Sequence, residues 1–206
     1  MESLKIQEKA IEKIVGKAIP KPSNDQNTDD IVPARYLKEI TFAKMGNYAY
    51  FDERFKDGKE VKEHVFNQPA HKGAKVLIAG ANYGCGSSRE HAPQALKRFG
   101  IDAIIAESFA EIFAGNCASL GIVGVTVPAK EIAELAEIAE LKPETIFEVD
   151  LSSKIVKAGD KTVGFEILEG RRQAFLNGTW DAMAILQHNQ AGIQATAAKL
   201  PYLKLK

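Results

Sequence analysis

The sequence predicts an α/β fold with a mixed, partly parallel sheet and flanking helices. Three observations lead to this prediction. Between residues 75 and 141, short aliphatic runs alternate with segments of helical spacing, a pattern typical of strand–helix–strand crossover units. After Pro143, three short strand-like runs follow, and Gly159-Asp160 marks a hairpin turn between two of them. The 206 residues, 45% of them hydrophobic, are enough to bury a full core, so we expect a single domain over residues 1–206.

Each element follows from its local pattern. Residues 1–16 form a charged N-terminal segment whose loose apolar stripe predicts a helix. Residues 38–70 mix charges, aromatic side chains and glycines, which is typical of a variable surface region of loops and short helices. In the alternating part, one helix ends near Gly100, because glycine suits the residue after a helix C-terminus. The remaining strands are expected at residues 75–79, 102–106, 122–127, 146–151, 154–158 and 162–168, and the remaining helices at 109–116, 130–141 and 180–198.

The charge balance excludes several classes of partner. Lys plus Arg and Asp plus Glu each number 27, so the net charge is zero and no long-range field draws the chain to nucleic acid or to an anionic membrane. The first residues, MESLKIQEKAIEKIVGKAI, mix acids and bases, which fits neither a secretory signal nor a membrane span. We therefore expect a cytoplasmic protein with no nucleic-acid or membrane partner.

The most informative segment is residues 75–91, which read KVLIAGANYGCGSSREH. An apolar strand leads into three glycines, at positions 80, 84 and 86, whose flexible backbone can turn N–H groups toward a ligand. Ser87 and Ser88 then fall where a helix is expected to begin, and the positive end of a helix favours a bound carboxylate. Arg89 adds a permanent forked donor for the same anion. The pattern indicates a receptor for a small carboxylate.

The residues of this segment do not fit three other glycine-rich motifs. No Gly-Lys-Ser/Thr follows the glycines, so the segment is not a Walker loop. Arg89 stands where a dinucleotide fingerprint needs its third glycine. The frame from Gly86 reads Gly-Ser-Ser-Arg-Glu, whereas a hydrolase nucleophile elbow needs Gly-x-Ser-x-Gly. The alternative that the residues alone leave open is a tight turn with Ser87 or Ser88 as the helix N-cap.

The chain has only two cysteines, Cys85 and Cys117. Two thiols are too few to hold a four-iron cluster, and their spacing fits neither a zinc ribbon nor a thioredoxin-type pair. We expect both to be small buried residues without a redox role, and we expect no metal ligands in this chain. Any iron–sulfur chemistry would come from another polypeptide.

Residues 82–93, which read NYGCGSSREHAP, resemble the signature of the swivelling domain of the aconitase superfamily, in the detached form of the 3-isopropylmalate dehydratase small subunits. Two further segments are similar to the same family, in the right order: residues 27–37, NTDDIVPARYL, and residues 175–181, FLNGTWD. Asn27 is a departure, because the family usually has an aspartate there. The resemblance covers nearly the whole chain and implies a swivelling β/β/α domain like the C-terminal domain of aconitase.

The resemblance also implies an activity. Members of this family are hydro-lyases that interconvert 2-isopropylmalate and 3-isopropylmalate by dehydration and rehydration in leucine biosynthesis. Their [4Fe–4S] cluster belongs to a separate large subunit. The resemblance therefore implies a small dicarboxylate substrate, a large iron–sulfur subunit as partner in a heterodimer or larger assembly, and activity only with that partner.

The main site residues follow from the resemblance position by position. Ser87 matches the serine that removes a proton from the carbon next to a carboxylate. A hydroxyl is a weak base, so its alkoxide would need stabilisation by backbone N–H groups and nearby positive charge. Ser88 and Arg89, together with Gly86 in the bend, match the groups that bind and orient the substrate carboxylate.

Three more residues match supporting positions of the family: Thr28, Asp29 and His91. From the residues alone, a cap of a turn or helix is the simpler interpretation of Asp29. A hydrogen bond to backbone groups behind the motif is the simpler interpretation of His91.

The segment after Tyr36-Leu37 resembles the family's specificity loop, and its residues Lys38, Ile40 and Phe42 are the predicted contacts. Apolar side chains there favour an isopropyl group over a third carboxylate, which would require an arginine or a similar donor. Lys38 is compatible with both an isopropyl group and a third carboxylate, so homoaconitate and citraconate (2-methylmalate) dehydratases are alternatives. A second alternative is a non-catalytic anion-binding module of the same fold, which would not need a serine beside the cation.

Overall fold

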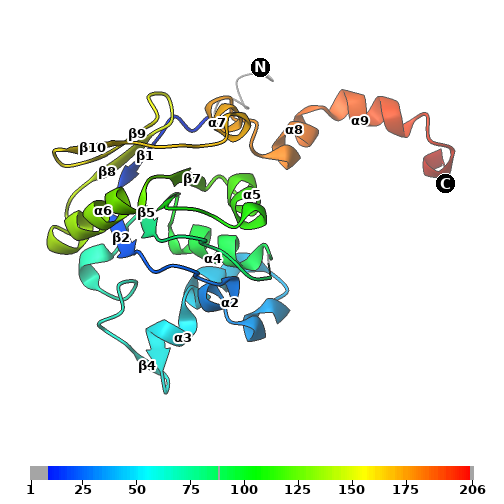
Figure 1. Ribbon diagram of the computed structural model, residues 1–206. Helices are drawn as coiled ribbons and strands as arrows, with labels where there is room; N and C mark the ends of the chain where they lie inside the picture. The colour runs from blue at the N-terminus through cyan, green and yellow to red at the C-terminus, as the bar shows by residue number, and fades with distance from the viewer. Residues whose placement is uncertain (1–8, 88, 205–206) are drawn as a thin grey trace.

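The computed structural model describes residues 9–87 and 89–204. Three layers are stacked in it: an antiparallel sheet, a parallel sheet, and a layer of helices with short segments beyond it (Figure 1). This arrangement confirms the predicted swivelling β/β/α fold class. The parallel strands form one four-stranded sheet, and the antiparallel strands form a second four-stranded sheet and a short two-stranded one.

The parallel sheet forms the middle layer, with strand order β2-β5-β6-β7. Its strands are β2 (Ala18–Lys21), β5 (Val76–Ala79), β6 (Ala103–Ala106) and β7 (Val123–Thr126). All residues of β5 and β6 are buried, because both faces of the sheet are covered. This is why these strands appear in the sequence as continuous aliphatic runs without polar alternation.

The antiparallel sheet has the strand order β1-β8-β9-β10. Its strands are β1 (Lys13–Gly16), β8 (Phe147–Asp150), β9 (Ile155–Ala158) and β10 (Lys161–Gly164). The predicted turn at Gly159-Asp160 joins β9 to β10, and Gly159 has a φ of +59°. The last three strands agree with the sequence prediction in place and order, although β10 is shorter than expected.

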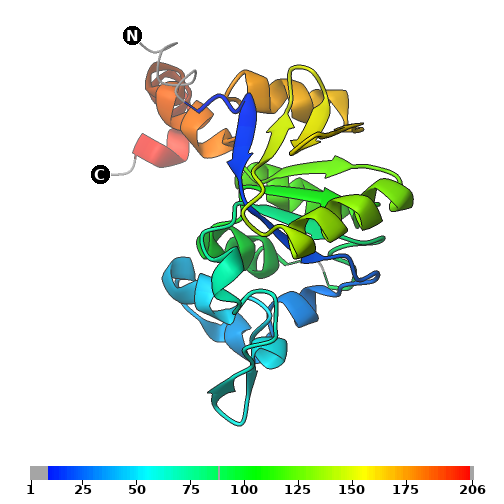
Figure 2. The ribbon, with the colours of Figure 1, turned by 90° about the vertical axis from the view of Figure 1, so that its left-hand side faces the viewer.

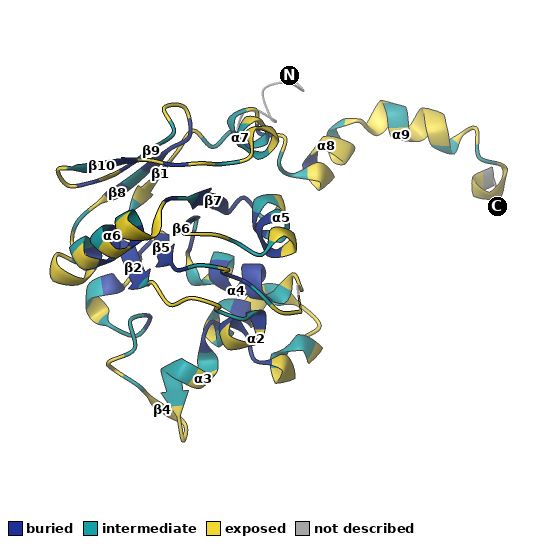
Figure 3. Ribbon diagram, in the orientation of Figure 1, coloured by how far each residue is buried: buried dark blue, intermediate teal, exposed yellow. Residues whose placement is uncertain are grey.

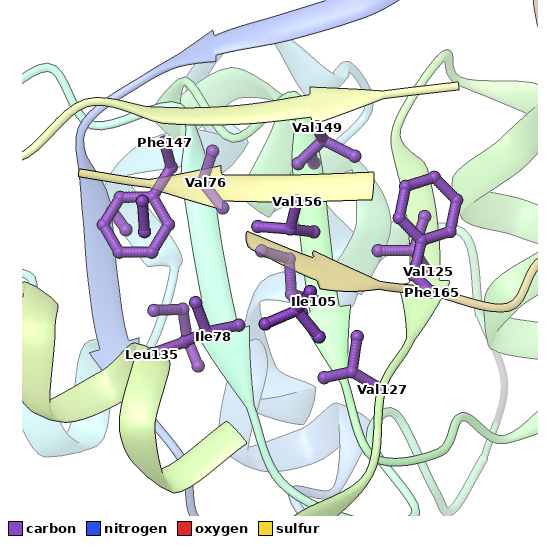
Figure 4. Close-up of a cluster of buried hydrophobic side chains, with 14 of the residues drawn as sticks. Val76, Ile78, Ile105, Val125, Val127, Leu135, Phe147, Val149, Val156 and Phe165 are labelled. Atoms are coloured by element: carbon purple, nitrogen blue, oxygen red, sulfur yellow. The ribbon is translucent and has the colours of Figure 1, made fainter. Parts of the chain in front are cut away.

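The two sheets enclose one hydrophobic cluster (Figure 4). The parallel sheet contributes alternate residues such as Val76, Ile78 and Ile105, and the antiparallel sheet faces them with Phe147 and Val149. Helix α6 (Ala129–Leu141) closes one side of this cluster through Leu135. A fully buried side chain of this kind contributes about 1.5–3 kcal/mol to folding.

The other face of the parallel sheet packs against α4 (His91–Phe99) and α5 (Glu111–Ser119). Leu77 and Ile104 point to this side, where Leu96 of α4 and Phe113 of α5 meet them. Helix α4 ends at Gly100, whose φ is +120°, as the sequence predicted. None of the described helices is both long and apolar enough to span a membrane.

Residues 28–71 cover the helix layer with short elements (Figure 2). They are α2 (Thr28–Ile31), η1 (Ala34–Lys38), η2 (Phe42–Tyr48), α3 (Phe51–Arg54), β3 (Phe55–Lys56), β4 (Lys59–Glu60) and η3 (Pro69–His71). Loops and short helices were predicted for residues 38–70 of this stretch. An ion-pair group ties the region to β2: Glu53 accepts hydrogen bonds from His64 at 3.2 Å and from Lys21 at 2.7 Å. These bonds hold the pKa of Glu53 down to about 2.

The prediction of a helix over residues 1–16 is wrong for its last part. Residues 13–16 form β1, where Ile14 pairs with Val149. Ile11 and Ile14 pack against the cluster between the sheets, so tertiary pairing overrides the local helical pattern. Residues 1–8 of this prediction lie outside the described part of the chain.

The C-terminal end projects away from the body after α7 (Glu169–Leu176). We call residues 182–204 the C-terminal arm; it comprises α8 (Ala182–His188), α9 (Gln190–Ala197) and η4 (Pro201–Lys204). Figure 3 shows that most of this arm is exposed. The sequence predicted one helix over 180–198, but Asn189 divides it by ending α8 and capping α9 through its side chain.

Candidate functional site

The glycine bend, residues 80–87, follows β5 at the carboxyl edge of the parallel sheet. Gly84 and Gly86 both have left-handed backbone angles, with φ values of +78° and +90°. A Cβ atom at Gly84 would lie 2.1 Å from Cγ of the buried Phe113. Glycine is therefore needed at position 84 both for its backbone conformation and for its missing side chain.

The side chain of Tyr83 anchors the bend to the interior of the protein. Its side chain is fully buried, and its hydroxyl lies 2.7 Å from the hydroxyl of Tyr50. Burial raises the pKa of Tyr83 well above its ordinary value, so the pair stays neutral and hydrogen-bonded. The Tyr83 ring also makes an edge-to-face contact with Phe113, with ring centroids 5.4 Å apart. The bend is thus anchored to residues 28–71 as well as to the helix layer.

A second segment, residues 26–28, runs beside the bend and is joined to it by three hydrogen bonds. The Gly84 N–H donates to the Gln26 carbonyl at 2.9 Å, and the Thr28 N–H donates to the Cys85 carbonyl at 2.9 Å. The Thr28 hydroxyl donates to the Ser87 carbonyl at 3.0 Å. Two motifs that are almost 60 residues apart in the sequence therefore form one junction.

Asn27, the position that departs from the family pattern, has a defined structural role. It is the N-cap of α2: its Oδ1 accepts from the Asp29 N–H at 2.9 Å, and its own N–H donates to Asp30 at 3.0 Å. An aspartate would accept the same bond, so the substitution preserves the cap. Asn27 also fills the space over Gly86, where a Cβ would lie 2.4 Å from its Oδ1.

The junction borders a small open pocket that gathers most of the predicted site residues. Ser87, Arg89 and Asp29 are exposed there, whereas Thr28 is buried. The residues lining the pocket are Thr28, Asp29, Val32, Leu37, Ser87, Arg89, His91 and Ala92. Gly86 lies next to it in the bend, and Ser88 lies outside the described residues. The structure thus brings Ser87, Arg89, Thr28, Asp29 and His91 together.

Helix α4 begins later than the sequence predicted. Its first residue is His91 and its N-cap is Glu90, whose side chain accepts a hydrogen bond from Gln94 at 2.7 Å. Ser87 therefore lies four residues before the helix and is not its N-cap. The reason is Pro93, because a proline fits only the first turn of a helix and so fixes the start close to itself. The helix N-terminus is a weaker source of positive potential at Ser87 than we expected.

Within the described residues, the His91 ring does not make the backbone hydrogen bonds that we expected. Its Nδ1 atom is buried and has no hydrogen-bond partner within residues 9–87 and 89–204. The ring lies against Phe42, with centroids 5.1 Å apart and an edge-to-face angle of 76°. His91 thus forms part of the pocket wall, held in place by an aromatic contact.

The specificity loop reaches the pocket only in part. Lys38 is exposed and Ile40 is 99% exposed, and neither lines the pocket. Phe42 meets the pocket indirectly, through His91. The apolar lining comes instead from Val32 and Leu37, which the prediction of specificity residues missed. Both belong to the matched segment 27–37, so the sequence did contain a signal for them.

The two cysteines differ in their surroundings. Cys117 is buried, and burial raises the pKa of its thiol far above its ordinary value. Cys85 is only half-buried, with its Sγ 3.3 Å from the Asp25 carbonyl oxygen. Over the described ranges, no three His, Cys, Asp or Glu side chains are grouped to hold a metal ion. With only two cysteines in the sequence, the thiolate donors do not fit an iron–sulfur cluster held by this chain alone.

A larger cavity, of about 600 Å³, lies between α5, β7 and α7. Its walls include Phe109, Ala118, Ile167 and Phe175, together with Arg171. None of the predicted site residues lines it. We place the candidate site at the glycine bend because the serine, the arginine and the flexible backbone needed for carboxylate chemistry meet there.

Comparison with known proteins first defines the class. A sequence model of the aconitase C-terminal domain matches residues 8–130, more than half of the chain. The match includes both segments that form the junction and the pocket.

Individual relatives define the family more closely. The 3-isopropylmalate dehydratase small subunit of Synechocystis is 43% identical over 94% of this chain and 95% of its own length. That of a Thermus thermophilus strain is 42% identical, with 92% and 94% covered. A crystal structure of 3-isopropylmalate dehydratase from Methanocaldococcus jannaschii is 28% identical, covers 89% of this chain and 98% of its own, and aligns with a TM-score of 0.63. The chain belongs to the family of 3-isopropylmalate dehydratase small subunits.

Proposed function

We propose that this chain is the small subunit of a hydro-lyase that interconverts 2-isopropylmalate and 3-isopropylmalate in leucine biosynthesis. The observation that supports this most directly is that Ser87 and Arg89 line the same open pocket. An arginine that binds a carboxylate beside a hydroxyl is the arrangement required to remove a proton from the carbon next to that carboxylate. Family membership supports the same activity.

In this proposal, Arg89 binds the substrate carboxylate that lies next to the reacting carbon. The C–H bond on that carbon breaks, its proton passes to Ser87 Oγ, and the electron pair forms the carbon–carbon double bond as the C–O bond on the neighbouring carbon breaks and hydroxide leaves. A proton from solvent converts the hydroxide to water, and Ser87 Oγ returns its own proton to solvent. Rehydration with the opposite orientation gives the isomer. Gly86 and Ser88 contribute backbone or hydroxyl donors to the carboxylate, while Thr28, Asp29 and His91 shape the pocket.

The alkyl group of the substrate would lie against Val32 and Leu37, since these are apolar pocket residues beside Ser87 and Arg89. Lys38 and Ile40 are exposed and stand away from this lining. They would act on specificity only after a second chain has covered the pocket. The openness of the site supports a partner that completes it, because a carbon acid of this kind needs a site from which water is excluded.

We propose that this partner is a large subunit that carries a [4Fe–4S] cluster. When bound, the cluster supplies a Lewis acid that weakens the bond to the leaving hydroxyl. Two cysteines, one of them buried, do not allow this chain to hold such a cluster itself. The chain alone is then inactive, and the pocket becomes catalytic only in the heteromeric complex.

The test is reconstitution with a cognate cluster-bearing subunit. The wild-type chain should be inactive alone and should form the unsaturated acid, measured by its ultraviolet absorbance, once the large subunit is added. Ser87→Ala should bind the large subunit normally but lower kcat by about 10²–10⁴-fold, since the general base is lost. The matched control is Ser119→Ala, which removes an exposed hydroxyl at the end of α5 and should retain wild-type turnover.

Two results would contradict the proposal. Near-normal turnover of the Ser87→Ala complex would remove the base from its assigned position. A wild-type chain that binds a dicarboxylate but activates no large subunit would instead favour the anion-binding module. A substrate panel containing citraconate and homoaconitate distinguishes the related dehydratases from one another.

A further inference from the structure

We propose that Thr28 is a positioning residue for Ser87, acting through the Ser87 carbonyl group. This inference rests on the proposed function, because it assigns to Thr28 a task in making Ser87 a competent base. The Thr28 side chain belongs to α2, while Ser87 belongs to the bend that follows β5. The hydroxyl bond of 3.0 Å between them crosses the junction directly beside the pocket.

The bond is set in a rigid environment. Thr28 is only 4% exposed, and its own N–H is fixed by the Cys85 carbonyl at 2.9 Å. The nearest other acceptor for the hydroxyl is Asn27 Oδ1 at 3.4 Å, a long contact that is already used to cap α2. The hydroxyl is therefore directed to the Ser87 carbonyl, and removing it would leave that oxygen without this donor.

A fixed carbonyl has two consequences for the serine to which it belongs. It fixes the ψ torsion of Ser87, which restricts the rotamers that the Cβ–Oγ bond can adopt at the exposed end of the bend. It also holds the negative end of the carbonyl dipole toward Thr28. If that oxygen turned into the pocket, its partial negative charge would oppose formation of the Ser87 alkoxide and raise the pKa of the hydroxyl.

The other charged and titratable groups facing Ser87 come from three sides of the pocket. Arg89 precedes α4 and favours the alkoxide, Asp29 of α2 opposes it, and the His91 ring at the start of α4 forms part of the pocket wall. None of them contacts the Ser87 carbonyl in the described structure. The effect of Thr28 is therefore separable from theirs by substitution.

The test compares Thr28→Val with Thr28→Ser in the reconstituted complex. Thr28→Val should lower kcat by about tenfold, the equivalent of one lost hydrogen bond, while KM changes less than about twofold. The pH at which kcat/KM reaches half its maximum should move upward, because the base becomes harder to ionise. Thr28→Ser retains the hydroxyl and should restore both the rate and the pH profile.

Thr126→Val is the matched control, since Thr126 also donates its hydroxyl to a backbone carbonyl, that of Glu166, at 3.3 Å and away from the pocket. It should leave kcat and the pH profile unchanged. A purely structural role for Thr28 would give lower stability with unchanged kcat and pH profile, which would overturn the inference.

A second measurement does not depend on activity. With ¹³C-labelled serine carbonyls in the free chain, the Ser87 carbonyl resonance should shift upfield in Thr28→Val and return in Thr28→Ser. An unchanged resonance in Thr28→Val would overturn the inference even if the complex were inactive. If the valine variant does not fold, Thr28→Ala replaces it in both measurements, with the same expected shift. An inactive wild-type complex with the expected carbonyl shifts would refute the proposed function and leave the hydrogen bond to Ser87 established.

Discussion

The glycine bend and the C-terminal arm both lie outside the two main sheets, yet they are held in very different ways. The bend packs against Phe113, is hydrogen-bonded to Tyr50 through Tyr83, and is hydrogen-bonded to residues 26–28. The arm is held chiefly through the two residues that precede it. The Trp180 Nε1–H donates to the Lys9 carbonyl at 2.8 Å, and Asp181 forms an ion pair with Lys9.

Beyond these two residues the arm has little support. Met183 is 63% exposed and Leu186 is 53% exposed, and neither of the two hydrophobic clusters contains a described residue after Trp180. This difference indicates that local order in this protein depends on contacts with segments distant in the sequence. The bend has no regular secondary structure but many such contacts, whereas the arm has helices but few contacts.

The largest expected effect is on the bend. Gly84→Ala should lower the free energy of unfolding by about 3 kcal/mol or more, because a Cβ there would overlap the Phe113 ring in addition to straining the backbone. The matched control is Gly58→Ala, which has a similar φ of +72° but no atom within 4 Å of the added Cβ. This control should cost only about 1 kcal/mol, for backbone strain alone. Urea denaturation measures both, and equal losses would show that the bend is not tightly packed.

The second effect is a pH dependence at the base of the arm. The hydrogen bonds from Lys9 and from the Ala184 N–H hold the pKa of Asp181 below its ordinary value of 3.8. A carboxyl group with a lowered pKa in the folded state stabilises at pH values above its unfolded pKa, and this contribution is lost as the pH falls through the folded pKa. The expected contribution is about 1 kcal/mol, which is present above about pH 4.

Trp180 reports this change directly, because it is the only tryptophan in the chain and lies next to Asp181. Its fluorescence should shift to longer wavelength as the pH falls below about 4 in the wild-type chain. Asp181→Asn should already show part of that shift at neutral pH and should depend less on pH. Identical titration curves for the two proteins would show that the Lys9–Asp181 pair does not hold the arm.

The smallest expected effect is that of removing the arm. A chain that ends at Asp181 should unfold in urea with a free energy within about 1 kcal/mol of the full-length chain, since the arm contributes no residue to either hydrophobic cluster. Unfolding should be followed by circular dichroism instead of tryptophan fluorescence, because Trp180 lies next to the truncation point. A decrease of more than about 2 kcal/mol in the free energy of unfolding would show that the arm stabilises the rest of the domain, so that the bend and the arm would not differ in this respect.

The sequence predicted the central part of the fold well. Continuous aliphatic runs such as Val76–Ala79 can be buried on both faces only in a covered parallel sheet, so their positions were predicted correctly. Gly100 marked the end of α4 for a local reason, its positive φ. The same helix begins later than predicted, at His91, because Pro93 fits only in its first turn.

Predictions failed where a distant segment decides the local structure. Residues 13–16 have a helical pattern but pair with β8, and Asn189 divides the predicted final helix by using its side chain as a cap. The predicted specificity contact at Ile40 is almost fully exposed in this chain alone, whereas Leu37 faces the pocket, so a role for Ile40 stays a prediction for the complex.

By itself, the sequence determined the fold class and the family, since these depend on residue types at short spacings, and the resemblance to that family implied the roles proposed for Ser87 and Arg89. The tertiary structure alone decided that Thr28 is bonded to the Ser87 carbonyl and that Val32 and Leu37 form the apolar wall. The physical reason is that glycine, proline and aliphatic periodicity act over a few bonds, whereas a site assembled from residues almost 60 positions apart exists only after the sheet and helix layers have packed.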